Sequence, residues 1–483
     1  MTIQSTPDFV RNTMIAPMEP PASQRGAVKW ARENLFSSVM NSVLTVLGLL
    51  ALFLLIRGIL PWLMNGVWNA NSLAECRAIV AANAGEGASG ACWAMIRERW
   101  HQFLFGFYPA DAYWRPVLAF ALLFVALAPI LFSGIRRSIL WMIGIVSVCL
   151  LLALVGVDGH ALTIGLAMLL MAALIGVVLF APHRLIWFTA LYPAIAFFLL
   201  WGGSVWAPVV AMAGFAVMVL VYQVLLPRLG VVMATALGFV AACLWWLFLQ
   251  TSVSTTIDGI LPFGLPAVDS DQFGGFLLAF VIGVTAIAAS LPIGILLALG
   301  RRSDMFLIKT LSVGFIEFIR GVPLITMLFT ASLLLQYFLP PRTNFDLILR
   351  VIILVTLFAS AYIAEVIRGG LAALPRGQYE AADALGLDYW KAQRLIIMPQ
   401  ALKIAIPGIV SSFIGLFKDT TLVAFVGLLD PLKGVTQVVR ADINWKGIYW
   451  EPYIFVGLIF FLICFGMSRY SMYLERKLKT DHR

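Results

Sequence analysis

The chain has 483 residues, of which 61% are hydrophobic and 12% are charged, and its mean hydropathy is +0.95. That balance excludes a soluble globular protein and indicates an all-α, polytopic transmembrane helical bundle. The net charge of +9 does not indicate nucleic-acid binding, because the basic residues lie in short clusters at the ends of apolar runs. This distribution is the one that the positive-inside rule produces in membrane proteins.

The first 36 residues are polar, and we expect them to form a cytoplasmic N-terminal segment rather than a cleavable signal peptide. Twelve apolar runs follow, each long enough to cross a hydrocarbon core of ~30 Å. The expected spans are 38–64, 116–134, 138–157, 161–181, 185–203, 206–226, 229–250, 273–299, 307–338, 347–369, 400–428 and 452–472.

The charges between the spans predict the orientation. With twelve spans, every basic cluster falls on the same side of the membrane, which identifies that side as the cytoplasm. The other side receives the loop 65–115, whose acids and arginines cancel, and the segment 251–272, which has aspartates but no Lys or Arg. We therefore expect both termini, including the tail 476–483, to be cytoplasmic.

Two of the five cysteines, Cys76 and Cys92, share the polar loop 65–115. If this loop faces an oxidising compartment, they can form a disulfide; the alternative is two unrelated thiols. Cys149, Cys243 and Cys464 lie inside apolar runs, which is typical of packing residues.

Composition divides the chain near residue 260, where a segment rich in Pro, Gly and polar residues reads as a linker. We expect an accessory region of about seven spans at 37–260, with few intramembrane charges. The five spans of 261–475 carry acidic and basic residues inside apolar runs. Intramembrane charge is costly and usually marks a pathway or a site.

Two similar motifs in the second half place a glutamate three residues before an arginine: Glu317 with Arg320, and Glu365 with Arg368. Residues at i and i+3 are neighbours on a helix, so each motif can neutralise itself internally. Alternatively, the charges pair across helices and form part of a cytoplasmic gate.

Lys418, Asp419, Thr420 and Thr421 form a second polar group. Rise per residue places Lys418 ~27 Å along its helix from Gln400, toward the outer side. An ammonium, a carboxylate and hydroxyls are the groups that an amino acid zwitterion requires, so this segment is a candidate substrate site. The alternative is a lysine that snorkels to the outer interface.

The most distinctive stretch is a polar island at 376–399, between two apolar runs. Ala382 and Gly386 are four residues apart, which puts two small residues on one helical face. We expect two short helices, the first ended by Gly386 and the second capped by Asp388, with Pro399 starting the next span. Spacing alone leaves open a simple connector.

Several segments resemble the polar amino acid family of ABC importer permeases. Glu380-Ala381-Ala382, Gly386 and Ile396-Ile397-Met398-Pro399 are similar to its EAA signature, with Met398 where leucine is usual. The segments at Glu317–Leu324, Ser360–Gln378 and Lys418–Leu422 resemble the same family, with Val322 in place of a threonine. The similarity covers roughly 270–475, and the earlier half looks like the added helices of the larger permease in general L-amino acid transporters.

The resemblance implies a non-catalytic subunit of an ATP-driven amino acid importer in the bacterial inner membrane. It implies a second permease, two ATP-binding subunits and a periplasmic amino acid-binding protein as partners. ATP would bind to the partner chains, because the sequence has no phosphate-binding P-loop. Glu380, Ala381, Ala382, Gly386 and Pro399 would couple to the ATPase, and Tyr362 and Glu365 would join the substrate site.

A rival interpretation is a secondary transporter of twelve spans, which often has both termini in the cytoplasm. It predicts two similar halves with coupling charges in both, whereas the first half here is poor in charge. A third class, a membrane scaffold without transport, does not account for the charged second half.

Overall fold

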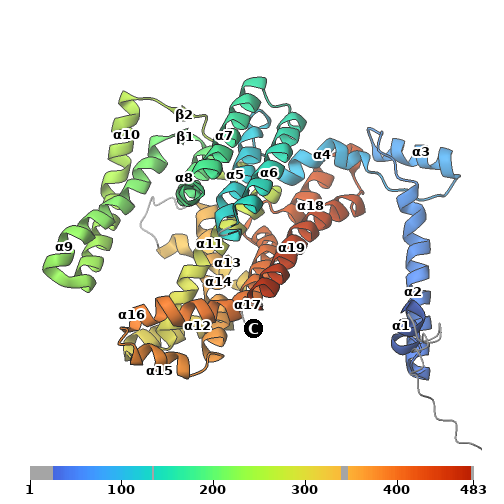
Figure 1. Cartoon of the computed structure of the whole chain (residues 1–483). Coiled ribbons are helices and arrows are strands. Elements are labelled where there is room, and N and C mark those ends of the chain that lie inside the picture. The colour runs from blue at the N-terminus through green and yellow to red at the C-terminus, as the bar shows by residue number, and fades with distance from the viewer. Residues whose placement is uncertain (1–25, 133–134, 339–345, 480–483) are drawn as a thin grey trace, which may run out of the picture. The chain divides into compact units, whose positions relative to one another are not determined.

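The computed structural model describes residues 26–132, 135–338 and 346–479, and the chain forms two compact units, residues 1–94 and 95–483 (Figure 1). The first 25 residues of the expected N-terminal segment and the last four of the tail lie outside the described residues. Among the described helices, eleven are long and apolar enough to cross a membrane, or twelve if one bent pair counts as a span. The structure thus confirms an all-helical polytopic fold.

The first unit contains one long apolar helix and a small folded loop. Its helices are α1 (Gly26–Asn34), α2 (Val39–Met64) and α3 (Leu73–Ala84). Ser38 caps α2 by accepting the Asn41 N–H at 3.1 Å, and none of the 26 residues of α2 is buried. A helix that is apolar all round is one that lipid or other chains surround.

The loop after α2 is held together by a disulfide between Cys76 and Cys92, whose Cα atoms lie 6.1 Å apart. Both cysteines are buried, and Val67 pairs with Cys92 in an isolated β-bridge. Ser72 caps α3 through the Glu75 N–H, and the Glu75 carboxylate accepts the Asn71 N–H, which is a reciprocal capping arrangement. The pairing of Cys76 with Cys92 is the one that the sequence suggested.

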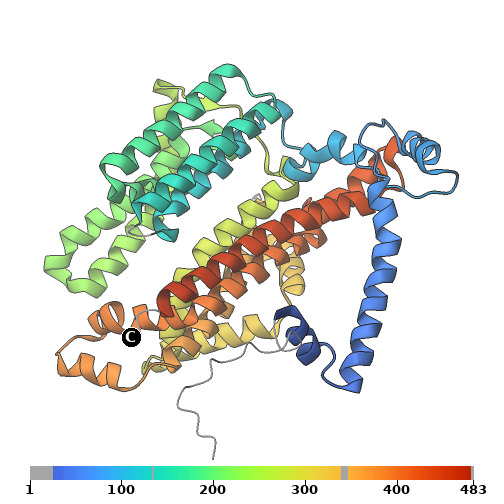
Figure 2. The same ribbon diagram turned by 45° about the vertical axis from the view of Figure 1, so that its right-hand side comes forward.

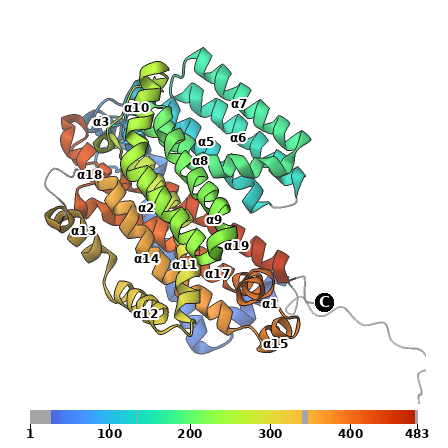
Figure 3. The same ribbon diagram turned by 90° about the vertical axis from the view of Figure 1, so that its left-hand side faces the viewer.

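The second unit begins with α4 (Ala94–Phe105), which lies in the expected loop 65–115, followed by helices that correspond to the remaining accessory spans. These are α5 (Trp114–Leu131), α6 (Arg136–Gly156), α7 (Ala161–Phe180), α8 (Leu185–Trp201), α9 (Trp206–Leu244) and α10 (Gln250–Ile260), with a π-helical turn at Trp245–Leu249. Gly230, at φ +72°, breaks α9 into two spans (Figure 3). The strands β1 (Gly203–Ser204) and β2 (Gly264–Leu265) pair antiparallel.

The remaining helices form the charged part of the chain. They are α11 (Gly275–Arg301), α12 (Phe306–Gly321), α13 (Leu324–Phe338), α14 (Leu347–Ala372), α15 (Gly377–Ala384), α16 (Tyr389–Ala392), α17 (Met398–Asp419), α18 (Pro431–Ala441) and α19 (Trp450–Lys479). Short 3₁₀ turns lie at Ala110–Ala112, Pro182–Arg184, Ser270–Gln272, Thr420–Val426 and Ile443–Trp445, and a π-helical turn at Gln393–Ile397. In Figure 2, α17 and α19 run alongside α11.

The expected span at 307–338 is not one continuous helix. The chain bends by 100° between Phe306–Gly321 and Leu324–Thr330. Val322 adopts an extended conformation (φ −111°, ψ 130°), as the residue before a proline prefers, and Pro323 lacks the N–H that would continue the helix. This segment is therefore a broken span or a re-entrant loop.

The expectation that Pro399 starts the next helix is met only in part, because Pro399 is the second residue of α17 but the helical path continues back to Tyr389. The candidate span runs from Tyr389 to Val426, so it begins ten residues before Pro399. The π-helical turn Gln393–Ile397 precedes Pro399, which has no N–H to bond to the Leu395 carbonyl. Pro399 therefore marks an irregularity inside the helix.

A single hydrophobic core joins the accessory helices to the charged helices within the second unit. Leu122 of α5, Ile143 of α6, Ile282 of α11 and Val351 of α14 all belong to this buried cluster. The rings of Phe120 and Phe280 also meet across α5 and α11, with centroids 4.6 Å apart. The linker near residue 260 therefore does not separate two independent cores.

We expect mass spectrometry of non-reduced peptides to find Cys76 linked to Cys92, because the fold buries both sulfurs in one small loop. Cys149, which is exposed in the structure, is the internal control for alkylation. Alkylation of both Cys76 and Cys92 without reductant, after denaturation, would show that the bridge does not form.

Candidate functional site

The polar island folds as two short helices joined by a tight turn. The helix α15 ends before Gly386, whose φ of +67° is the left-handed conformation that glycine tolerates best. The Asp388 carboxylate then caps α16 by accepting the Lys391 N–H at 2.9 Å, and this bond lowers the pKa of Asp388. The prediction that Gly386 ends the first helix and Asp388 caps the second is confirmed.

The face that α15 presents outward differs from the expected one. Ala382 is 1% exposed, so its small side chain serves packing inside the chain and is not available to a docking partner. Glu380, Ala381 and Gly386 are exposed. The expectation that Ala382 contacts an ATPase directly is therefore corrected, because the helix turns this residue inward.

Two large apolar side chains that sequence reasoning missed dominate the outer face of the loop. Leu385 is 72% exposed and Trp390 is 66% exposed, on either side of Gly386. Exposed apolar groups beside charged ones are typical of protein contact sites. Two large apolar residues in an otherwise polar loop are a signal that the sequence carries, but only the fold shows that both side chains are exposed.

An ion-pair cluster joins α11, α12 and α14, and α12 lies at the same end of the second unit as α15 (Figure 1). Arg301, the last residue of α11, contacts Glu317 of α12 at 2.9 Å and Glu365 of α14 at 2.6 Å. Glu365 also receives Arg368 at 3.0 Å and Arg320 at 3.5 Å. Three guanidinium groups thus meet two carboxylates, which leaves one positive charge.

Each of the two ways of pairing that the motifs allow occurs in the structure. Arg368 pairs with Glu365 on its own helix, as the i, i+3 spacing predicts, whereas Glu317 and Arg320 both reach other helices. Arg301 was missed because it lies at a helix end, where a basic residue reads as a topology signal. Tyr362 belongs to this cluster, since the Arg320 guanidinium lies 5.6 Å from its ring centroid.

The Lys418 segment lies at the end of α17 and is only partly accessible. Lys418 is exposed and Asp419 is partly buried, whereas Thr420 is fully buried against Gly283 of α11. The Thr420 hydroxyl donates to the Phe417 carbonyl at 2.7 Å, and the Thr421 hydroxyl donates to the Lys418 carbonyl at 2.9 Å. The structure therefore removes Thr420 from the surface that a substrate reaches.

Glu365 and Lys418 do not form one site. A Cβ on Gly408 would lie 2.7 Å from Val366, so α14 at Val366 is level with α17 at Gly408. Lys418 is ten residues further along α17, which is ~15 Å at the helical rise. The two charged groups of an amino acid are separated by far less, so Glu365 and Tyr362 belong to the ion-pair cluster and not to a zwitterion site with Lys418.

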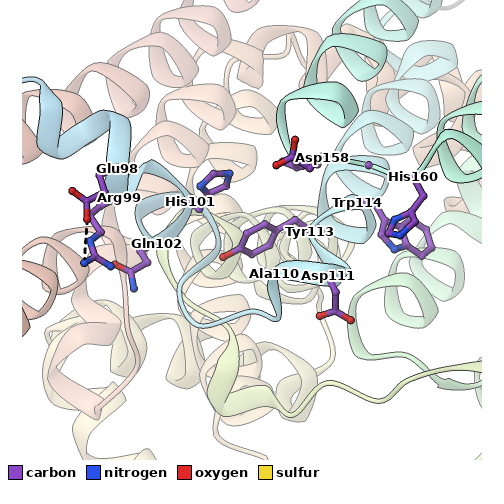
Figure 4. Close-up of a pocket in the computed structure, with 12 residues that line it drawn as sticks. Glu98, Arg99, His101, Gln102, Ala110, Asp111, Tyr113, Trp114, Asp158 and His160 are labelled. Atoms are coloured by element: carbon purple, nitrogen blue, oxygen red, sulfur yellow. Dashed lines mark ion pairs between the residues drawn. The ribbon is translucent and has the colours of Figure 1, made fainter. Parts of the chain in front are cut away.

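A pocket of about 490 Å³ lies among α4, the turn before α5 and the α6–α7 turn (Figure 4). The His101 ring stacks on Tyr113, with centroids 5.3 Å apart, and burial lowers the pKa of His101 while Asp158 opposes this shift. These residues come from three distant segments, so no sequence motif indicated them.

Within the described ranges, no group of His, Cys, Asp and Glu is arranged to hold a metal ion.

Residues 290–480 match the family model described as "Binding-protein-dependent transport system inner membrane component". The matched region begins inside α11 and includes the ion-pair cluster, the polar island and Lys418.

Two curated relatives extend the similarity over the whole chain. The glutamate/glutamine/aspartate/asparagine transport system permease protein BztC of Rhodobacter capsulatus is 63% identical over 479 residues, which cover 99% of this chain and 100% of that protein. The inner membrane amino-acid ABC transporter permease protein YhdY of Escherichia coli K12 is 36% identical, over 95% of this chain and 96% of that protein.

Among solved structures, the chain is similar to one described as "an amino acid ABC transporter with histidines", at 29% identity and a TM-score of 0.37. The match covers 42% of this chain and 91% of that chain. The full-length relatives show the family: this chain belongs to the permeases of amino acid ABC transporters.

Proposed function

We propose that this permease carries the four amino acids glutamate, glutamine, aspartate and asparagine. The observation that carries the proposal is the 63% identity, along the entire chain, to a permease named for transport of these four. They share a short side chain that ends in a carboxylate or a carboxamide, and each presents a carbonyl-type oxygen to a hydrogen-bond donor.

The chain forms the translocation pathway together with a second, similar permease, and two ATP-binding subunits hydrolyse ATP. A periplasmic binding protein delivers the substrate. Two observations support this assembly. The permease model matches once, at 290–480, and the described ranges contain one polar island, 376–399, which we call the docking loop. Two ATP-binding subunits need two such loops, so a second permease supplies the other.

The docking loop faces the cytoplasm of a bacterial cell, and both termini lie on that side. The charges support this orientation, because Arg301, Arg302, Arg376 and Arg394 gather around the loop, whereas the segment 251–272 is acidic. Leu385 and Trp390 enter a groove on the ATP-binding subunit, with Ala381 and Glu380 at its edge. ATP and any other cofactor bind to the partner chains.

Lys418 binds the substrate carboxylate, and Asp419 offers the opposite charge to the ammonium group. Thr421 contributes the lone pairs of its hydroxyl, whose proton is already donated to a carbonyl. An exposed ammonium beside a partly buried carboxylate supports this assignment. The ion-pair cluster around Glu365 is the cytoplasmic gate, because breaking its contacts between α11, α12 and α14 opens a polar route between those helices.

Uptake of labelled glutamate into vesicles that hold the whole complex should require ATP and should resist collapse of the proton gradient. Glutamine, aspartate and asparagine should compete with it, and leucine, which lacks a side-chain carbonyl, is the control. Uptake that follows the proton gradient instead would favour the secondary transporter.

Changing Leu385 to Glu should abolish co-purification of the ATP-binding subunits, because a charge replaces the apolar group that enters the groove. The matched control is Ile443→Glu, since Ile443 is also highly exposed, at 89%, but lies on the loop between α18 and α19. Normal binding of the ATP-binding subunits to the Leu385→Glu chain would remove Leu385 from the interface.

Changing Lys418 to Met keeps the aliphatic stem and removes the charge. Losing a charge-assisted hydrogen bond costs about 2–3 kcal/mol, so the apparent affinity for substrate should fall roughly thirtyfold or more. Basal ATPase activity reports intact assembly, and Lys446→Met, at another exposed lysine, is the control. Uptake with native affinity in the Lys418→Met variant would assign the substrate site to other residues or to the second permease.

A further inference from the structure

Two consecutive arginines end α11 and contact different parts of the chain. Arg301 is the last residue of the helix and Arg302 is its C-cap. Successive residues of a helix point about 100° apart, so neighbouring side chains reach different partners. Their Cα atoms are joined by one planar peptide and lie ~3.8 Å apart.

Arg301 is the centre of the ion-pair cluster. Its Nη1 donates to Glu317 Oε1 at 2.9 Å and to Glu365 Oε1 at 2.6 Å, so one guanidinium joins α11, α12 and α14. The Glu365 side chain is only 15% exposed, which makes these contacts stronger than those of an exposed ion pair. Any displacement of the end of α11 therefore changes the contacts of both glutamates.

Arg302 faces the docking loop instead. Its Nη1 donates to the Tyr379 hydroxyl at 2.8 Å and to the Leu371 carbonyl at 3.3 Å, and its guanidinium lies 5.3 Å from the Tyr379 ring centroid. Tyr379 is on α15, the first helix of the docking loop, and is partly buried. Arg302 thus contacts the first of the two short helices.

A second contact holds the loop to the following span. Gln400 Nε2 donates to Gln378 Oε1 at 2.9 Å, which ties the start of α15 to α17. This bond positions α15 relative to α17 but makes no contact with the ion-pair cluster. The chain itself joins α14, which carries Glu365, to α15, and the Arg302–Tyr379 contact adds a separate link from α15 to α11 and Arg301.

We propose that Arg302 and Tyr379 are positioning residues that transmit movement of α15 to the ion-pair cluster around Glu365. The inference rests on the proposed function, in which α15 docks on an ATP-binding subunit and the cluster is the gate. Movement of α15 displaces the Tyr379 hydroxyl, Arg302 follows, and the adjoining Arg301 shifts against Glu317 and Glu365. Neither Arg302 nor Tyr379 touches the substrate.

The test uses the whole complex in proteoliposomes, with the binding protein and labelled glutamate present. The variants are Arg302→Gln, Tyr379→Phe and the double variant, and Lys309→Gln, at an exposed cation of α12, is the matched control. Two quantities are measured: the ratio of stimulated to basal ATPase activity, and the amount of substrate transported per ATP hydrolysed.

We expect Arg302→Gln to leave assembly and basal ATPase activity unchanged and to lower transport per ATP roughly tenfold, a typical size for coupling between sites. Tyr379→Phe should have a smaller effect, since the ring still faces the guanidinium. The double variant should be no worse than Arg302→Gln, because residues that act through one contact are not additive.

Three outcomes would overturn the proposal: native transport per ATP in Arg302→Gln, fully additive effects in the double variant, or loss of assembly in both single variants. The last would give the pair a purely structural role. A wild-type complex that transports no amino acid with ATP would instead contradict the proposed function, so the two failures are distinguishable.

Discussion

The Glu365 carboxylate lies within a membrane-spanning helix, and its charge has to be compensated there. A charged side chain inside a spanning helix is costly unless it is paired. Three arginines from α11, α12 and α14 surround Glu365, and Arg301 extends the contact to Glu317. The ends of three helices are thereby held together by one set of charges, on which the rest of the charged region depends.

The break after α12 fits this constraint. Arg320 has to reach Glu365 on a neighbouring helix, and α12 ends one residue later, at Gly321. Val322 and Pro323 then turn the chain by 100°, so α13 does not carry the direction of α12 onward. Because α12 stops one residue after Arg320, the ion pair holds Arg320 in place and does not fix the direction of α13.

The accessory helices are packed against the charged helices, because the two groups share one hydrophobic core. The segment after α4 approaches the start of α11 closely. Gly106 has a φ of +69°, and a Cβ there would collide with the backbone of Gly274. Gly275 donates its N–H to the Leu429 carbonyl at 2.8 Å, which joins the start of α11 to the loop before α18. The end of α11 away from the arginines is therefore also held in place.

Hydropathy and charge placement predicted the helical membrane fold and nearly all of the spans, and helix-ending and capping residues predicted the two short helices of the polar island. These features depend on residues that are close in sequence, as with Gly386 ending one helix and Asp388 capping the next. The pairing of Cys76 with Cys92 was open in the sequence, because a shared loop does not establish that two sulfurs meet.

Tertiary structure alone decided which side chains meet or face outward. Ala382 turns inward while Leu385 turns outward, and Glu365 pairs with three arginines far from Lys418. These facts depend on how helices that are distant in sequence rotate and align against one another. Helical spacing specifies a face within one helix, but it does not specify the neighbour that this face meets.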